Sequence, residues 1–173
     1  DIFKVYDTSD ASTKASYFHN SISGYHAAKM RRFNELMSFH IEKGNPEVFN
    51  MLNTKYIIYR DDDNQLQYVE NDQINGNAWF INTLTAVSNA DAEIRALDTL
   101  KTKISAVINK KYHESKSYTI DSEASIELID YAPNKLVYSS TNRNDGFAVF
   151  SENYYKNGWQ VTIDGQEVPH YNV

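Results

Sequence analysis

The acidic run Asp61-Asp62-Asp63 has the residue types and the spacing to hold a divalent cation against a diphosphate, because carboxylate oxygens suit hard ions such as Mg²⁺ or Mn²⁺. Asp61 and Asp63 are the candidate ligands. The sequence ahead of them lacks the parallel βαβ pattern of a nucleotide pocket. A calcium loop would need glycine where Leu66 stands and glutamate where Asp72 stands. We therefore expect the run to form a solvated hairpin tip, with a metal-dependent enzyme as an alternative.

Basic and imidazole side chains gather around the start of an expected helix. They are His19, His26, Lys29, Arg31 and Arg32. Cations in a first helical turn oppose the macrodipole and cost about 0.3–1 kcal/mol each, so a bound anion such as a phosphate would explain their placement. The alternative is a solvated helix face, in which Glu35 pairs with Arg31 four residues earlier and with Arg32 three residues earlier.

Aromatic residues surround the turn dipeptide Asn157-Gly158. Tyr154 and Tyr155 precede it, and Trp159 follows it. Exposed rings beside amide and carboxylate side chains suit the apolar faces and the hydroxyls of a sugar, so Tyr155 and Trp159 are candidate contacts of a carbohydrate-binding module. The alternative is structural, because a strand tryptophan is more often in the core and a turn tyrosine more often covers a packed edge.

The sequence lacks the usual signatures of nucleophilic or zinc-dependent catalysis. It has no Gly-x-Ser-x-Gly elbow, no His-Glu-x-x-His helix and no glycine-rich phosphate loop. It has no cysteine, which excludes disulfides and thiolate metal sites, and its five histidines are scattered. We therefore name no catalytic residue and expect no cofactor.

Two amphipathic helices are the clearest elements that would position these residues. Apolar residues at three- and four-residue spacing predict one helix over 27–43 and a second over 91–100. Pro46 is suited to start a short helix between them. The β-branched and aromatic run 56–59 predicts a strand, and 66–69 predicts its hairpin partner across the acidic tip.

The last part of the chain is typical of β-strands. The expected strands are 125–131, 135–140, 147–154, 159–163 and 168–173, with Asp145-Gly146, Asn157-Gly158 and Asp164-Gly165 between them. Such dipeptides supply the positive φ angles of tight hairpin turns, which predicts an antiparallel meander. We expect an α+β fold in two parts: a mixed α/β subdomain with two main helices over 1–115, and an antiparallel β-sandwich-like subdomain over 116–173.

The composition is that of a folded globular chain, with 173 residues, 41% hydrophobic and 23% charged. A net charge of −6 argues against a nucleic-acid partner. No segment reaches the roughly 20 apolar residues that cross a bilayer. The chain begins at Asp1 without a leader and stops at Val173 within an expected strand, so we expect a segment of a longer protein that is truncated at its C-terminus.

Five stretches in a fixed order cover much of the chain. They are SYFHNSISGYHAAKMRRFNELM (16–37), NMLNTKYIIY (50–59), GNAWFI (76–81), EIRAL (93–97) and VFSENYYKNGWQVTIDGQEVPHYNV (149–173). Together they resemble the YfhO-type family of bacterial multi-spanning membrane proteins. None of the five is a catalytic motif, so the specificity of the resemblance comes from their number and order.

The resemblance implies an extracytoplasmic region near the C-terminal end of a polytopic protein in the bacterial cytoplasmic membrane. The family is similar to glycosyltransferases that use a polyprenyl-phosphate sugar, whose acidic catalytic residue belongs to an early loop outside this chain. The chain would then be an accessory domain without turnover of its own. The implied partners are the protein's own transmembrane region and a polyprenyl-phosphate sugar or an envelope glycan.

Within the first of these stretches, several side chains are the expected contacts for an acceptor, for a donor phosphate or for the membrane region. They are His19, Tyr25, His26, Lys29 and Arg32. The carbohydrate-binding module of a cell-envelope protein and the independent metal-dependent enzyme stay open as alternative functions.

Overall fold

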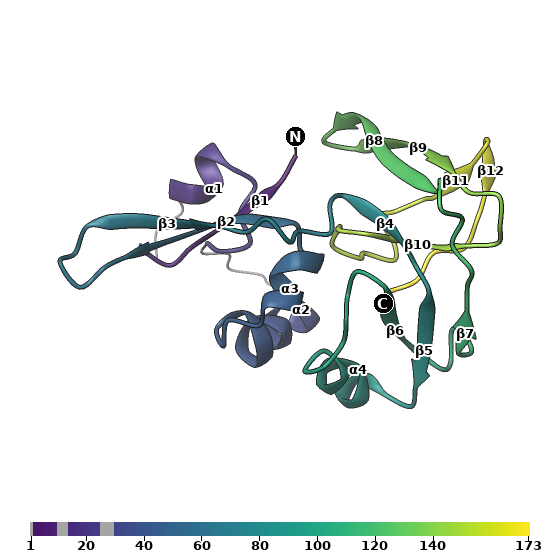
Figure 1. Ribbon diagram of the computed structural model, residues 1–173, viewed down its shortest axis with the longest axis horizontal. Helices are drawn as coiled ribbons and strands as arrows, with labels where there is room; N and C mark the ends of the chain where they lie inside the picture. The colour runs from purple at the N-terminus through teal and green to yellow at the C-terminus, as the bar shows by residue number, and fades with distance from the viewer. Residues whose placement is uncertain (1, 10–13, 25–29) are drawn as a thin grey trace.

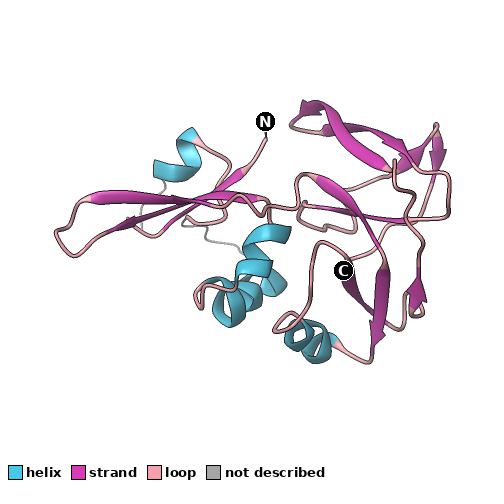
Figure 2. Cartoon of the chain, in the orientation of Figure 1, coloured by secondary structure: helices cyan, strands magenta, loops and turns pink. Residues whose placement is uncertain are grey.

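The computed structural model describes residues 2–9, 14–24 and 30–173. It confirms the α+β class, with short helices and several small sheets whose strands pair mostly antiparallel. A three-stranded sheet and the helices packed on it form one side of the molecule, and the later strands form the other side (Figure 1). The helices gather on the N-terminal side and beneath the small C-terminal sheets (Figure 2).

The N-terminal elements build a sheet with helices against it. They are β1 (Lys4–Asp7), α1 (Lys14–Phe18), α2 (Arg31–Leu36), η1 (Met37–Ile41), α3 (Pro46–Met51), β2 (Thr54–Arg60) and β3 (Leu66–Glu70). β1 pairs parallel with β2, and β2 pairs antiparallel with β3. The acidic run therefore lies at the tip of the β2–β3 hairpin, as the sequence predicts.

The first amphipathic helix is divided into two conformations. Its described part begins at Arg31 as α-helix and continues from Met37 to Ile41 as a π-helical turn. Ile41 is buried against the sheet, with 1% of its surface exposed. Gly44 has a positive φ of 72°, which lets the chain turn sharply from η1 into α3.

The C-terminal part contains one helix and nine short strands among the described residues. They are β4 (Ala78–Ile81), β5 (Thr83–Val87), α4 (Ala90–Ala96), β6 (Ser105–Asn109), β7 (Lys116–Ser117), β8 (Ser125–Ala132), β9 (Lys135–Thr141), β10 (Phe147–Phe150), β11 (Thr162–Ile163) and β12 (Gln166–Glu167). β5 pairs parallel with β6 and antiparallel with β7, and β8 and β9 form a hairpin.

The C-terminal strands do not form one continuous meander. β10 pairs antiparallel with β4, and Asp145-Gly146 is therefore not a hairpin turn between β9 and β10. Asp164-Gly165 does form the turn of the β11–β12 hairpin, with φ angles of 51° and 81°. The expected final strand over 168–173 is instead irregular. β4 and β10 lie on either side of the expected boundary after residue 115, so the β4–β10 pairing joins the two expected parts. The division into subdomains stays a prediction.

Two apolar clusters hold the fold together. The first contains Ile22, Ile41, Val48 and Phe49, and lies between the N-terminal sheet and its helices. The second contains Trp79, Ile81, Leu84, Ala106 and Ile108. Met51, at the end of α3, packs against both clusters. α3 therefore occupies the junction between the two parts of the molecule.

Candidate functional site

A groove of about 450 Å³ lies between the N-terminal sheet and the segment that joins η1 to α3; we call it the sheet–helix groove. Its apolar lining consists of Tyr6, Ile41, Phe49, Ile57 and Val69, and its polar lining includes Thr8, Glu42, Glu70, Asn71 and Asp72. Figure 1 shows α2 and α3 together on one side of the sheet that supplies the opposite wall.

The half-buried ring of Tyr6 packs against the ring of Phe49, which is only 5% exposed. The rings of Tyr6 and Phe49 lie 5.6 Å apart between centroids and are tilted by 35°. Tyr6 comes from β1 and Phe49 from α3, so packing of the helix onto the sheet brings the two rings together. Burial, and next the nearby charge of Glu42, raises the pKa of the Tyr6 hydroxyl. The hydroxyl is therefore a neutral donor at physiological pH.

The polar lining includes three acidic residues. The Glu70 carboxylate accepts a hydrogen bond of 3.4 Å from the hydroxyl of Tyr56 and lies 3.7 Å from the ammonium of Lys55. Asp72 accepts a hydrogen bond of 3.0 Å from the side-chain amide of the next residue. The Glu42 carboxylate has no hydrogen-bond or ion-pair partner among the described residues. Glu70 pairs with Tyr56 on the sheet face opposite the groove-lining Ile57 and Val69, so its carboxylate points away from the groove, and Glu42 and Asp72 supply the free acceptors of the lining.

The groove therefore combines the half-buried ring of Tyr6 with hydroxyl and carboxylate groups. This combination suits a polyhydroxylated ligand, because rings cover the apolar face of a sugar while acceptors and donors pair with its hydroxyls. A phosphate fits poorly, since negative charges at short range repel it. The groove could hold a glycan or a cation, and it disfavours an anionic lipid-linked donor.

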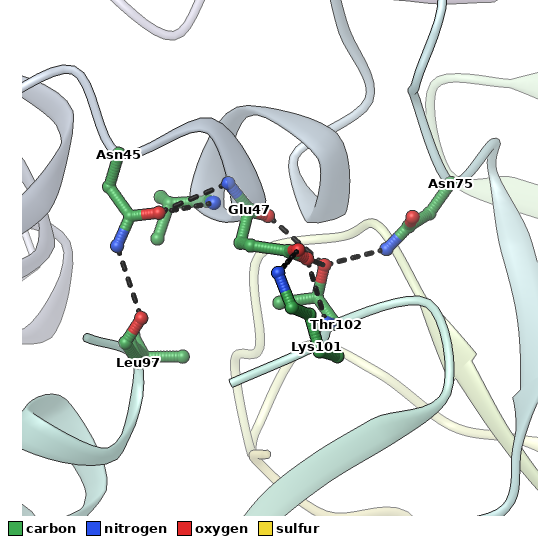
Figure 3. Close-up of polar contacts among 7 residues, drawn as sticks. Asn45, Glu47, Asn75, Leu97, Lys101 and Thr102 are labelled. Carbon is green, nitrogen blue, oxygen red and sulfur yellow. Dashed lines mark hydrogen bonds and ion pairs between the residues drawn. The ribbon is translucent and has the colours of Figure 1, made fainter. Parts of the chain in front are cut away.

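The α3 helix, which supplies Phe49, is fixed at its first turn by Glu47 (Figure 3). The Glu47 carboxylate accepts hydrogen bonds from the backbone amide and the hydroxyl of Thr102 and pairs with the ammonium of Lys101 at 3.0 Å. Asn75 donates to the Thr102 hydroxyl oxygen at 3.0 Å. These contacts fix α3 to the loop before β6.

Asn45 links the same helix to α4 (Figure 3). Its side-chain oxygen caps α3 by accepting from the amides of Glu47 and Val48, and its side-chain nitrogen donates to the carbonyl of Leu97 at 3.1 Å. That nitrogen also lies 3.2 Å from Nδ1 of the buried His40. The His40 Nε2 atom lies 2.7 Å from the carbonyl oxygen of Ile94, which can only accept, so Nε2 carries the proton and Nδ1 accepts.

The candidate residues of the basic helix start are only partly described. Tyr25, His26 and Lys29 lie outside the described residues. His19 is exposed just after α1. The guanidinium of Arg32 contacts the Glu93 carboxylate on α4 and the side-chain oxygen of Asn172. The structure thus places His19 and Arg32 outside the sheet–helix groove, and their proposed role in binding stays a prediction.

The pairing expected for this helix face is present for one arginine. Arg31 donates to Glu35 at 2.8 Å in an i,i+4 pair, whereas Arg32 reaches Glu93 and not Glu35. Arg32 therefore has a long-range structural contact that helical spacing could not indicate.

The aromatic candidates near the C-terminus have different environments. Tyr155 is 58% exposed, and its ring covers Gly158 so closely that a β-carbon at this glycine would lie 2.5 Å from the ring. The indole nitrogen of the half-buried Trp159 donates to the carbonyl of Asn153 at 2.9 Å. Tyr155 thus has an exposed ring and Trp159 a half-buried, anchored one, and their role in carbohydrate binding stays a prediction.

The acidic tip has a structural role for at least one of its carboxylates. Asp61 accepts hydrogen bonds from the amides of Asp63 and Gln65 and from the side chain of Gln67. The hydrogen bonds from the Gln67 side chain and from the backbone amide of Gln65 lower the pKa of the Asp61 carboxyl. Burial opposes this shift, and the hydrogen bond from the backbone amide of Asp63 adds to it. Within the described ranges, no group of three acidic, histidine or cysteine side chains could hold a metal ion.

A second cluster of titratable groups, which sequence reasoning missed, joins β1 to the end of β10. The Lys4 ammonium donates to the carbonyl oxygen of Ser151 at 2.5 Å and to its hydroxyl at 3.1 Å. Burial lowers the pKa of Lys4 and raises that of Glu152, while their mutual attraction opposes both shifts. Burial also raises the pKa of Tyr138 to about 12. We interpret this cluster as a structural link.

The groove residues were also missed, because their common location depends on the tertiary fold. Glu42 is distant in sequence from Glu70 and Asp72, and each alone is an ordinary exposed acid. The only local signal is the alternating run at the N-terminus, which indicates that Tyr6 belongs to a strand.

None of the protein-family models, curated proteins or solved structures compared with the chain matches it. In the part of the chain that the structure describes, no helix is both long enough and apolar enough to cross a membrane. The functional interpretation therefore depends on the residues of the groove and on the family-like segments of the sequence.

Proposed function

We propose that this chain is an accessory domain of a YfhO-type polytopic glycosyltransferase and that it holds the glycan acceptor in the sheet–helix groove. In this proposal the domain lies on the extracytoplasmic face of the bacterial cytoplasmic membrane, next to the protein's own transmembrane region. Catalysis belongs to another part of the longer protein. The five ordered family-like segments support the membrane context.

The single observation that carries the binding role is the composition of the groove. The half-buried ring of Tyr6 can cover a sugar ring, and the exposed carboxylates of Glu42 and Asp72 can pair with hydroxyls. The same carboxylates repel a polyprenyl phosphate. We therefore assign the groove to the acceptor and not to the lipid-linked donor.

A pair of arginine substitutions on β3 tests the proposal. Val69 lines the groove and Leu66 does not, yet both lie on the same strand with 51% and 60% of their surfaces exposed. Val69→Arg places a long cationic side chain on the groove face of β3 and should close the groove. Leu66→Arg makes the same change of charge elsewhere on the strand and is the matched control.

The first readout is binding of a neutral oligosaccharide to the isolated chain, detected through changes in the amide chemical shifts of groove residues. Val69→Arg should abolish the shifts at Gly44 and Asn71, and Leu66→Arg should preserve them. In the full-length protein, Val69→Arg should raise the KM for the acceptor and leave kcat nearly unchanged. Saturable shifts near Tyr155 with none in the groove would instead support the carbohydrate-binding module.

A further inference from the structure

We propose that a row of aromatic rings with a lysine at each end docks the domain onto an anionic lipid surface, an inference that rests on the membrane location in the proposed function. The rings are those of Tyr112, His113, Tyr118, Phe147 and Tyr171. Together with Lys111 and Lys116 they form what we call the lysine–aromatic surface. Figure 1 shows β6, β7 and the C-terminus, which supply or flank most of these residues, on the side of the molecule away from β3.

Each ring of the row contacts the next. The Tyr171 ring lies 6.4 Å from that of Tyr112 and 6.1 Å from that of His113, between centroids. The Phe147 ring lies 6.1 Å from that of His113 and 6.0 Å from that of Tyr118. Three of the five rings also pack against the second apolar cluster, so the core holds the row in place. Tyr112, at the outer end, is 48% exposed.

An exposed lysine covers a ring at each end of the row. The Lys111 ammonium lies 4.6 Å from the centroid of the Tyr112 ring, and the Lys116 ammonium lies 4.9 Å from that of Tyr118. Neither lysine forms an ion pair with a residue that the structure describes. Both ammonium groups therefore keep their N–H donors for an anionic partner.

The charge of this surface differs from that of the whole chain, whose net charge is −6. Lys110 is also exposed and has no ion pair among the described residues. Two exposed acids are close: Glu114 by sequence, and Asp145, whose charge adds to burial in raising the pKa of the Tyr118 hydroxyl. At physiological salt, charges beyond about 8 Å are largely screened. An anionic surface that approaches this face is therefore attracted by its three unpaired lysines.

The arrangement of the rings favours a lipid surface over a stacked ligand. A nucleic-acid base or a sugar needs an open ring face, but the protein's own lysines cover the end rings. Protein–protein interfaces are depleted in lysine. Lysine and tyrosine occur together at lipid headgroups, where the lysine stem lies on apolar surface and its ammonium reaches the phosphates.

The test is co-sedimentation of the chain with vesicles at about 0.15 M salt. One set of vesicles is phosphatidylcholine alone, and the other is an equal mixture of phosphatidylcholine and phosphatidylglycerol. We expect binding to the mixture only, weakened by added salt. Replacing both Lys111 and Lys116 by Gln should lower the partition coefficient about thirtyfold, because each lysine near an anionic surface contributes about fivefold. Tyr112→Ser should lower it several-fold.

Replacing both Lys135 and Lys156 by Gln is the matched control. These two lysines are exposed and have no ion pair or ring contact among the described residues, so the change of net charge is the same and binding should be preserved. Amide chemical shifts check that every variant is folded. An equal loss of binding in the two lysine pairs would overturn the inference, since it would show general attraction. Wild-type binding in Tyr112→Ser would also overturn it.

The remaining outcomes separate this inference from the proposed function. Binding of inorganic polyphosphate without binding of anionic vesicles would overturn lipid docking. Oligosaccharide-induced shifts at Gly44 and Asn71 measure the acceptor role on a different surface. Those shifts without vesicle binding would overturn lipid docking and leave the acceptor role standing. Vesicle binding that depends on the lysine–aromatic surface, without those shifts, would support lipid docking and overturn the acceptor role.

Discussion

Thr102 donates both its backbone amide and its hydroxyl to the carboxylate of Glu47, at 3.0 and 3.1 Å, although the two residues are 55 positions apart in sequence. This contact fixes the first turn of α3 to the loop before β6 (Figure 3). Burial alone would raise the pKa of Glu47. The bonds from Thr102 and the nearby Lys101 outweigh burial and hold the pKa below its ordinary value of 4.5.

Glu47→Gln should lower the free energy of unfolding by about 1–3 kcal/mol, the usual cost of impairing a hydrogen-bonded carboxylate. In the wild type, the contribution of Glu47 is fully present above pH 4.5 and is lost as the pH falls through the lower pKa of the folded state. The variant should therefore lack this acid-dependent loss. Urea unfolding over a pH series measures both effects.

Glu35→Gln is the control for that experiment, because Glu35 forms an exposed i,i+4 pair with Arg31. Such a pair contributes only about 0.3–0.5 kcal/mol. Equal losses of stability in Glu47→Gln and Glu35→Gln would show that the link between α3 and the β6 loop does not stabilise the fold.

Glu152 should produce the opposite pH dependence. Burial raises its pKa above 4.5, and the attraction of Lys4 only partly opposes this. The folded state then binds the proton more tightly than the unfolded chain, so this contribution is fully present below pH 4.5 and is lost as the pH rises through the folded pKa. Glu152→Gln should remove this loss of stability with rising pH. Urea unfolding from pH 4.5 to neutrality measures the effect.

Glu167→Gln, which changes an exposed acid on β12, serves as the control for Glu152. A Glu152→Gln profile that is parallel to the wild type at every pH would contradict the proposed role of burial at this site.

Local patterns in the sequence predict several elements well, because neighbouring residues determine them. Asn89 caps α4 by accepting from the amide of Ala92, and Asn45 caps α3, which begins at Pro46. The β2–β3 hairpin follows from two β-rich runs around an acidic turn. In each case the contacts join residues that are near in sequence, from the caps, which act within three positions, to the hairpin, whose pairs run from Arg60–Leu66 to Tyr56–Glu70.

Long-range contacts explain what the sequence could not predict. The short apolar strand β10 has no local feature that selects β4 over β9 as its partner. The choice follows from the core, in which Phe147 and Val149 pack against a cluster that contains Trp79 and Ile81. The sheet–helix groove is hidden for the same reason, because Tyr6, Glu42 and Val69 meet only after the sheet and helices assemble.

Asn45 should show that a capping residue can have a second role. Asn45→Asp keeps the oxygen that caps α3, so a purely capping role predicts no loss of stability. The substitution also replaces the nitrogen that donates to the Leu97 carbonyl with a second oxygen. We expect Asn45→Asp to destabilise the protein by about 1–3 kcal/mol, because it leaves a carbonyl unpaired and places two oxygens in contact.

Asn45→Ala completes the comparison, since it removes the cap and the link to α4 together. Thermal and urea unfolding of the two variants measure the two contributions. Wild-type stability in Asn45→Asp, with a loss only in Asn45→Ala, would limit Asn45 to its capping role.

Arg32 and its neighbour Arg31 offer the last comparison. Arg32→Ala should lower the free energy of unfolding by about 1–3 kcal/mol, because it leaves the Glu93 carboxylate, only 13% exposed, without its cation. Arg31→Ala should cost no more than about 0.5 kcal/mol, since its pair with Glu35 is exposed. Urea unfolding measures both, and carboxypeptidase digestion should release the C-terminal residues around Asn172 faster in Arg32→Ala alone.

The Arg32 result also determines how activity measurements on this residue must be interpreted. A loss of glycosylation in a full-length Arg32→Ala variant would follow from loosening of α4 and the C-terminal segment as readily as from loss of a phosphate contact. Arg32→Lys separates the two, because lysine keeps the charge that a phosphate needs but lacks the fork that reaches Glu93 and Asn172 together. Activity retained in Arg32→Lys despite reduced stability would support the phosphate contact, and activity that falls in parallel with stability would support a structural role.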